Sequence, residues 1–138
     1  MKMRRVFSKL KKEVQNGGIV MLQETHIVDE NMIKMYWKMK YASNCVSTNR
    51  GGVITLFDNS YEVLESHIDT EGRMTAIVIE NDRLKTIVVN VYCHNDHRDS
   101  YTFIEKVYDK IFELMDEHPD AFVILGLLCK LPNSIPEL

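Results

Sequence analysis

A short apolar run ending in a charged residue decides the fold of this chain: Ile19-Val20-Met21-Leu22-Gln23-Glu24-Thr25-His26. Four consecutive apolar residues are typical of a buried strand. Glu24 follows directly, at the strand end where open α/β sheets place ligand-binding residues. Its carboxylate is the kind of hard oxygen ligand that Mg²⁺ prefers, although on the local sequence alone an exposed strand-end glutamate is the simpler interpretation.

Helical patterns lie on both sides of this run. Apolar residues recur at helical spacing over residues 3–15, which predicts an amphipathic helix, and Asn16-Gly17-Gly18 supplies residues that tolerate positive φ at its end. Asp29 is a plausible N-cap for a second helix over residues 30–39. The basic residues of the first twelve positions, which contain no acid, fit a solvated helix face.

The middle of the chain predicts strands and the last third predicts a helix and a strand. Short β-type runs, separated by Gly, Asn and Asp, suggest an antiparallel meander; they are Val46-Ser47 and residues 53–57, 61–68, 74–80 and 84–92. Apolar residues then step by three and four over residues 98–117, which predicts a long amphipathic helix. Residues 121–125 form another apolar run, for which we expect a buried strand.

This order of elements predicts one mixed α/β domain. The chain has 138 residues, 45% of them hydrophobic, and a formal net charge of −3, values that fit a globular protein rather than a disordered one. No apolar run approaches the roughly 20 residues that span a bilayer. The three cysteines, Cys45, Cys93 and Cys129, have no metal-type spacing, so we expect no disulfide framework and an intracellular, reducing compartment, nuclear or cytoplasmic.

Further candidate site residues follow other strands. Tyr92 ends a strongly β-type run, and Asn95 comes three residues later, so a hydroxyl and an amide could contact a phosphate. Arg73 opens another strand, and arginine binds phosphate in bidentate fashion. Each also has an ordinary explanation: strand-end packing for Tyr92, a turn or helix cap for Asn95, and a solvated surface position for Arg73.

The histidines offer a rival constellation. His26, His94 and His97, together with Glu24, contain the donor types of a zinc site. Their spacing matches no recognised zinc pattern, so surface histidines are the simpler interpretation.

Five short motifs occur in a fixed order along the chain: Leu22-Gln23-Glu24-Thr25-His26, Arg50-Gly51-Gly52-Val53, Gly72-Arg73, Asn90-Val91-Tyr92 with Asn95, and Val123-Ile124-Leu125-Gly126. In this order they resemble the exonuclease-endonuclease-phosphatase (EEP) superfamily, and especially the endonuclease domains of non-LTR retrotransposons. The resemblance covers residues 4–126. It implies a four-layer α/β sandwich, incomplete here, over residues 1–126, with residues 127–138 as an unrelated irregular tail.

The resemblance also implies chemistry. Superfamily members cleave phosphodiester bonds with Mg²⁺, with DNA as the substrate in the retrotransposon branch. By motif, Glu24 would be the metal ligand, Tyr92 and Asn95 would contact or polarise the scissile phosphate as catalytic residues, and Arg73 would bind phosphate. A cation on a phosphoryl oxygen stabilises developing charge.

Departures from the superfamily pattern indicate impaired catalysis. After Gly126 the superfamily has Gly-Asp-Phe-Asn, whereas this chain continues Leu127-Leu128-Cys129-Lys130, and the later Ser-Asp-His motif is missing. We therefore expect a truncated, catalytically impaired endonuclease-type domain whose uncovered sheet edges favour self-association. The alternatives are a non-catalytic module that binds nucleic acid or protein, and a phosphatase-type member of the same superfamily.

Overall fold

The computed structural model describes residues 3–94 and 97–129. Within these residues, three helices and seven strands follow one another. In order, they are α1 (Met3–Val14), β1 (Ile19–Gln23), α2 (Glu30–Tyr36), β2 (Lys40–Asn44), β3 (Val53–Phe57), β4 (Glu62–Ile68), β5 (Met74–Asn81), β6 (Leu84–Tyr92), α3 (His97–Glu117) and β7 (Phe122–Leu128).

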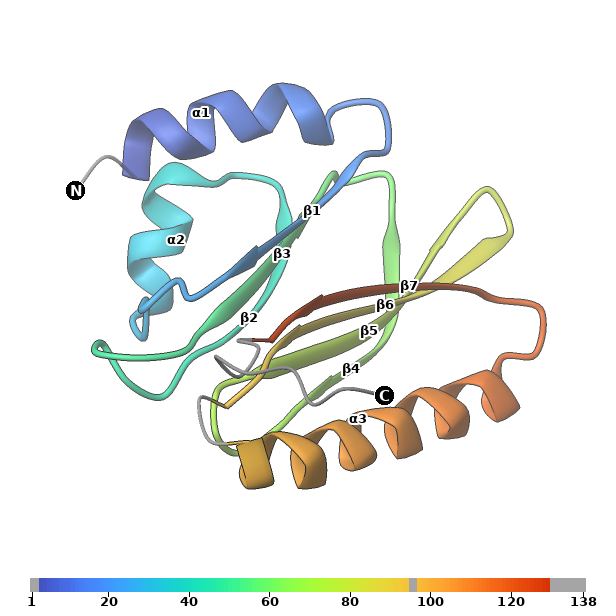
Figure 1. The fold of residues 1–138 in the computed structure, drawn as a ribbon. Helices are drawn as coiled ribbons and strands as arrows, with labels where there is room; N and C mark the ends of the chain where they lie inside the picture. The colour runs from blue at the N-terminus through green and yellow to red at the C-terminus, as the bar shows by residue number, and fades with distance from the viewer. Residues whose placement is uncertain (1–2, 95–96, 130–138) are drawn as a thin grey trace, which may run out of the picture.

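The elements form four layers, two of helix outside and two of sheet inside (Figure 1). The first sheet has the strand order β1-β3-β2, and the second has the order β4-β5-β6-β7. Helices α1 and α2 pack on the outer face of the first sheet, around Phe7, Ile33 and Trp37. Helix α3 packs on the outer face of the second sheet, and residues such as Phe57 and Ile77 fill the space between the sheets.

Several expectations from the sequence are confirmed. The helix expected at 3–15 is α1, the one expected at 98–117 is α3, and the runs at 53–57 and 84–92 are β3 and β6. Asp29 caps α2, because its carboxylate accepts a hydrogen bond from the Asn31 backbone N–H. Helix α2 ends earlier than expected, at Tyr36 rather than near residue 39.

The expected single meander is wrong in part. Strands β4, β5 and β6 do form an antiparallel meander, but β3 pairs with β1 and β2 in the other sheet. The strand expected at Val46-Ser47 lies earlier, at Lys40–Asn44, where the sequence has no apolar run. Hydrophobic patterning marks strands, but it does not state which sheet a strand joins.

The two strands expected to be buried are edge strands. Strand β1 pairs antiparallel with β3 and is half-buried throughout, whereas β7 pairs parallel with β6 and is largely exposed. Among the described strands, β7 is the last of its sheet and pairs with β6 alone, so its other edge is open. Strand β7 also runs to Leu128, past residue 126, and residues 130–138 of the expected tail lie outside the described residues.

The residues described here contain no helix that is both long enough and apolar enough to cross a membrane.

Candidate metal and phosphate site

Three loops meet where β1, β3 and β5 begin or end. The Thr25 backbone N–H donates to the Gly52 carbonyl at 3.1 Å, and the Gly52 N–H donates in turn to the Gly72 carbonyl at 3.0 Å. The His26 N–H donates to the Gly51 carbonyl at 3.1 Å. Backbone hydrogen bonds therefore connect the Glu24 loop, the Arg50-Gly51-Gly52 loop and the Gly72-Arg73 turn. These segments contain three of the five ordered sequence motifs.

Glycine is required at two of these connections. Gly52 and Gly72 have φ of +95° and +73°, a region that side-chain-bearing residues rarely adopt. A Cβ on Gly72 would lie 2.7 Å from the Val46 backbone nitrogen, and one on Gly52 would lie 3.0 Å from the His26 nitrogen. These glycines allow the loops to approach closely enough for the candidate site to form.

Glu24 lies on a strained backbone. Glu24 and His26 both have positive φ, +56° and +57°, and neither is a glycine. Such residues cost of order 1–3 kcal/mol each and cluster at functional sites. Between them, the Thr25 hydroxyl is buried and has no hydrogen-bond partner among the described residues. The Glu24 carboxylate itself is about half exposed, at 51%, and lies 3.7 Å from His26 Nε2.

Tyr92 has both Glu24 and Arg73 as neighbours. The Arg73 guanidinium carbon is 5.5 Å from the centre of the Tyr92 ring, a cation–π arrangement, and the Tyr92 N–H donates to the Arg73 carbonyl at 2.9 Å. Burial raises the pKa of the Tyr92 hydroxyl, and the negative charge of Glu24 and a hydrogen bond to its carboxylate raise it further. A carboxylate, a phenol and a guanidinium from three separate segments are therefore adjacent.

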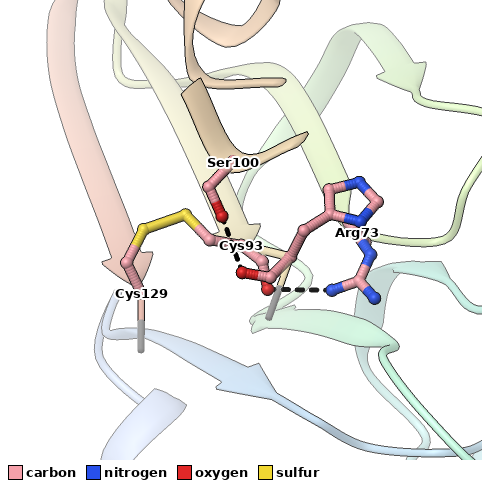
Figure 2. The surroundings of a disulfide bond; sticks show 5 residues. Arg73, Cys93, Ser100 and Cys129 are labelled. Atoms are coloured by element: carbon pink, nitrogen blue, oxygen red, sulfur yellow. Dashed lines mark hydrogen bonds between the residues drawn. A yellow bond between two sulfur atoms is a disulfide. The ribbon is translucent and has the colours of Figure 1, made fainter. Parts of the chain in front are cut away.

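Arg73 is buried rather than solvated. Its side chain donates from Nη1 to the Cys93 carbonyl at 2.8 Å (Figure 2), and 6% of the residue is exposed. Asp69 fixes its backbone, since Asp69 Oδ1 accepts from the N–H groups of both Arg73 and Met74 at 2.8 Å. The surface interpretation of Arg73 is wrong, because this turn folds the arginine over Tyr92.

A buried amide connects the two sheets beneath the site. Asn90 Oδ1 accepts from the Gln23 side-chain amide at 2.9 Å, while Asn90 Nδ2 donates to the carbonyls of Leu22 and Ile54 at 3.2 and 3.1 Å. No role was predicted for Asn90 from the sequence. Its signal was an amide inside an otherwise apolar strand, a group that must find buried partners.

A polar cavity of about 440 Å³ opens beside Arg73. It is lined by Val46, Ser47, Arg50, Thr70, Glu71, Arg73, His94 and Asp99. Two arginines and two acids share its wall, so it suits a ligand that carries both charge and hydrogen-bonding groups. The predicted phosphate contact Asn95 lies outside the described residues.

The expectation of no disulfide is wrong for one pair. Cys93 and Cys129 form a disulfide, whereas Cys45 is free (Figure 2). The parallel register of β6 and β7 places Tyr92 opposite Leu128, so the next residue on each strand is a cysteine facing the other. The separation of 36 residues hid this proximity in the sequence.

The rival zinc constellation is not assembled by the residues that the structure describes. His94 Nε2 pairs with Glu71 Oε2 at 2.8 Å, while His26 lies near Glu24. The His97 side chain lies outside the described part of the chain. Within that part, the His and carboxylate groups that gather at metal-binding spacing are Glu65, Glu117 and His118, which belong to other elements.

Comparison with known proteins shows the fold. Truncated Caenorhabditis elegans TDP2 matches with a TM-score of 0.69 and 17% identity, covering 96% of this chain and 59% of that one. Another C. elegans TDP2 structure matches at 0.68 and 17%, covering 96% and 45%, and D. rerio TDP2 humanized by 14 mutations matches at 0.59 and 18%, covering 91% and 54%. No family profile and no curated protein sequence matches the chain.

TDP2 is an α/β sandwich of EEP type, so this chain has that fold class, as the ordered motifs implied. The chain spans about half the length of the TDP2 chains that it matches.

Proposed function

We propose that this chain is the front part of a metal-dependent DNA endonuclease-type domain from the retrotransposon branch of the EEP superfamily, which binds Mg²⁺ and phosphodiester but hydrolyses it poorly. One observation carries the proposal. Tyr92 has both Glu24 and Arg73, which are distant from it in the sequence, as neighbours at the end of the sheets where this fold class is expected to act. In this proposal, Glu24 holds the cation, Arg73 and Tyr92 contact the phosphate, and Asn95 assists them.

The residues present fit Mg²⁺. This ion takes one or two protein carboxylates and keeps several waters, and the half-exposed Glu24 leaves room for them. The strained loop and the unpartnered Thr25 hydroxyl indicate a position built for a ligand rather than for stability. A bound Mg²⁺ would supply charge neutralisation at a phosphoryl oxygen.

The chain's own residues position the phosphodiester. The Arg73 guanidinium donates from Nη1 to the Cys93 carbonyl, and Arg73 lines the polar cavity, so its remaining N–H groups are those that would donate to phosphate oxygens. A phenol is protonated at neutral pH, and the pKa of the Tyr92 hydroxyl is raised further. Its one O–H now donates to the Glu24 carboxylate, and it would donate to a phosphate oxyanion instead once Glu24 holds the cation. Since two of the three groups are donors, the site favours an anionic substrate such as a DNA phosphate.

Poor hydrolysis follows from the end of β7. Where the superfamily pattern has Gly-Asp-Phe-Asn, whose acid and amide hold the attacking water and the phosphate, this chain has Leu127-Leu128-Cys129-Lys130. Leu128 pairs with Tyr92, and Cys129 is bonded to Cys93, so the positions beside the site are apolar or oxidised. Removing a member of a catalytic group that acts as a unit costs several orders of magnitude in rate.

The binding part of the proposal is tested by fluorescence anisotropy with a short labelled DNA duplex. We expect Mg²⁺ to increase the affinity of the unaltered chain, and Glu24→Gln to remove that increase while leaving the metal-free affinity unchanged. Glu105→Gln, an exposed glutamate on α3, is the matched control and should behave like the unaltered chain. If Mg²⁺ changes nothing in the unaltered chain, the site proposed here is wrong.

The catalytic part is tested by nicking of supercoiled plasmid with Mg²⁺. We expect turnover several orders of magnitude below that of an intact endonuclease, indistinguishable from Glu24→Ala. Robust nicking that disappears in Glu24→Ala would show that the chain is an active enzyme and would overturn the claim of impairment.

A non-catalytic binding module is the second candidate, favoured by the surface of α1. Arg4, Arg5 and Lys9 line one exposed hollow on this helix, and its first turn contains no acid. Binding through this helix would be independent of Mg²⁺ and of Glu24, and would weaken steeply as salt increases. The same anisotropy series therefore separates the two candidates, because Arg4→Gln with Lys9→Gln lowers the metal-free affinity in the second case alone.

A further inference from the structure

A second cluster of metal-ligating side chains lies on β4 and at the end of α3, elements that contribute nothing to Glu24, Arg73 or Tyr92. One oxygen of the Glu65 carboxylate contacts His118 Nε2, and the other lies 3.1 Å from His67 Nε2. Glu117 approaches the same point, and ligand atoms of Glu65, Glu117 and His118 all lie within 4.8 Å of one another. Two histidines and two carboxylates thus converge.

The positions of Glu65 and His67 are unusual for the face they occupy. Glu65 pairs with Val78 and His67 pairs with Ala76, two residues of the core beneath α3. Side chains at paired positions share a face, so an apolar residue would be expected at each. The ladder is irregular between Val63 and Glu65, and such bulges re-aim side chains.

The C-terminal end of α3 has a fixed backbone and carries negative charge, which is unfavourable at a helix C-terminus. The His118 N–H donates to the Leu114 carbonyl at 2.9 Å, and the His118 carbonyl accepts from Ala121 at 3.1 Å, so the imidazole extends from a fixed backbone. The last turn of α3 has no basic residue, while Asp116 and Glu117 are acidic. A helix C-terminus is stabilised by positive charge, which a bound cation would supply here.

We propose that Glu65, Glu117 and His118 bind a Zn²⁺ ion, with a water as fourth ligand and His67 holding the second oxygen of Glu65. The donor set decides the ion class: imidazole nitrogen with carboxylate oxygen suits zinc, whereas Mg²⁺ and Ca²⁺ select oxygen ligands. Three protein ligands with one open position is the arrangement of zinc sites that keep a water. Hydrogen bonds to ligating carboxylates orient them, which is the role assigned to His67.

The competing explanation is structural. Glu65 with two histidines would be an ion-pair clasp between β4 and α3, and charged side chains on an edge strand also discourage unwanted strand pairing. This clasp needs His118 and Glu65 but has no need of Glu117, which is exposed. Glu117 therefore distinguishes the two explanations.

Zinc titration of the full chain tests the proposal, after treatment with a chelator and with calorimetry and thermal unfolding as readouts. We expect one Zn²⁺ to bind at this cluster and to raise the unfolding temperature, whereas any rise that Mg²⁺ causes should be lost in Glu24→Gln and kept in Glu117→Gln. Glu117→Gln should lower zinc affinity at least about tenfold while leaving the metal-free unfolding temperature unchanged. His67→Gln should lower zinc affinity about 10- to 100-fold. Glu62→Gln on the same strand, Cys45→Ser and Glu24→Gln should all bind zinc normally.

Cobalt provides a signature that a clasp cannot give. Co²⁺ added to the metal-free chain should produce the visible absorption of a four-coordinate ion, which Zn²⁺ then displaces, and Glu117→Gln should abolish it. Absence of saturable binding in the unaltered chain, or zinc affinity that Glu117→Gln and His118→Gln leave unchanged, would overturn the proposal.

Discussion

The backbone of the Glu24 loop has a conformation that lowers the stability of the fold. Glu24 and His26 both adopt the left-handed region, and backbone bonds from Thr25 and His26 to Gly52 and Gly51 hold them there. Strain of this kind persists when the surrounding structure fixes it. The backbone of Glu24 is therefore fixed before any ligand binds, which lowers the cost of ordering the loop on binding.

Gly72 is the residue on which this arrangement most depends. Gly72→Ala places a Cβ against the Val46 backbone as well as imposing positive φ, so we expect it to lower the free energy of unfolding by more than the roughly 1–2 kcal/mol that φ alone costs. Because Arg73 follows directly, the affinity for DNA in Mg²⁺ should also fall. Urea unfolding and the anisotropy assay measure the two effects.

Gly17→Ala is the matched control for Gly72→Ala. Gly17 has φ of +90°, but a Cβ there meets its nearest neighbour, the Tyr61 hydroxyl, at an ordinary 3.5 Å, and it lies away from the site. It should show the φ cost alone and unchanged DNA binding. Equal stability losses for both variants, with DNA binding intact in Gly72→Ala, would contradict the role given to this turn.

Prediction from sequence succeeded for residues in motifs and failed for residues whose partners are distant. Tyr92 has Arg73 and Glu24 as neighbours, so three of the motifs meet there, while the roles assigned to these residues stay predictions. Asp69 escaped notice although it anchors the Arg73 turn, because an aspartate before Thr70-Glu71-Gly72 has the composition of any turn. Asn90 was visible as a polar residue in an apolar strand, but its partners in the other sheet were not.

At the scale of elements, periodicity predicted helices better than sheet membership. The spacing of apolar residues placed α1 and α3 within one or two residues, because a helix buries one stripe of its own surface. Strand pairing depends instead on where turns direct the chain. After Phe57 the chain crosses from one sheet to the other, a step that neither the apolar pattern nor the turn residues at Asp58-Asn59 encode.

The disulfide joins the ends of β6 and β7 beside the site. Reduction by a thiol such as dithiothreitol should lower the free energy of unfolding by about 2–4 kcal/mol, because the bond closes a loop of 36 residues in the unfolded chain. The Cys93 carbonyl holds Arg73, so reduction should also weaken DNA binding. Urea unfolding with and without the thiol measures the first effect.

Two variants check that the effect belongs to this bond. Cys129→Ser without thiol should match the reduced chain, and Cys45→Ser should match the oxidised chain, since Cys45 is free. If the thiol still lowers the free energy of unfolding of Cys129→Ser, the change does not come from the disulfide.

For the molecule as a whole, the two edges of the second sheet differ sharply. Strand β4 carries Glu62, Glu65 and His67 and an irregular ladder, devices that protect an edge from pairing with another chain. Strand β7 has the sequence Phe-Val-Ile-Leu-Gly-Leu-Leu, with no charge, and Phe122 and Leu128 are 63% and 48% exposed. Association between molecules should therefore proceed through β7.

Light scattering after size-exclusion chromatography, over a range of protein concentrations, measures this association. We expect the mass of the unaltered chain to increase with concentration, and Ile124→Lys in the middle of β7 to reduce that increase by placing a charge on the exposed edge. Leu64→Lys on β4 is the matched control, since Leu64 has similar exposure on the opposite edge of the same sheet, and it should leave association unchanged. A mass independent of concentration, or an equal response to both lysines, would show that β7 is not the surface through which copies meet.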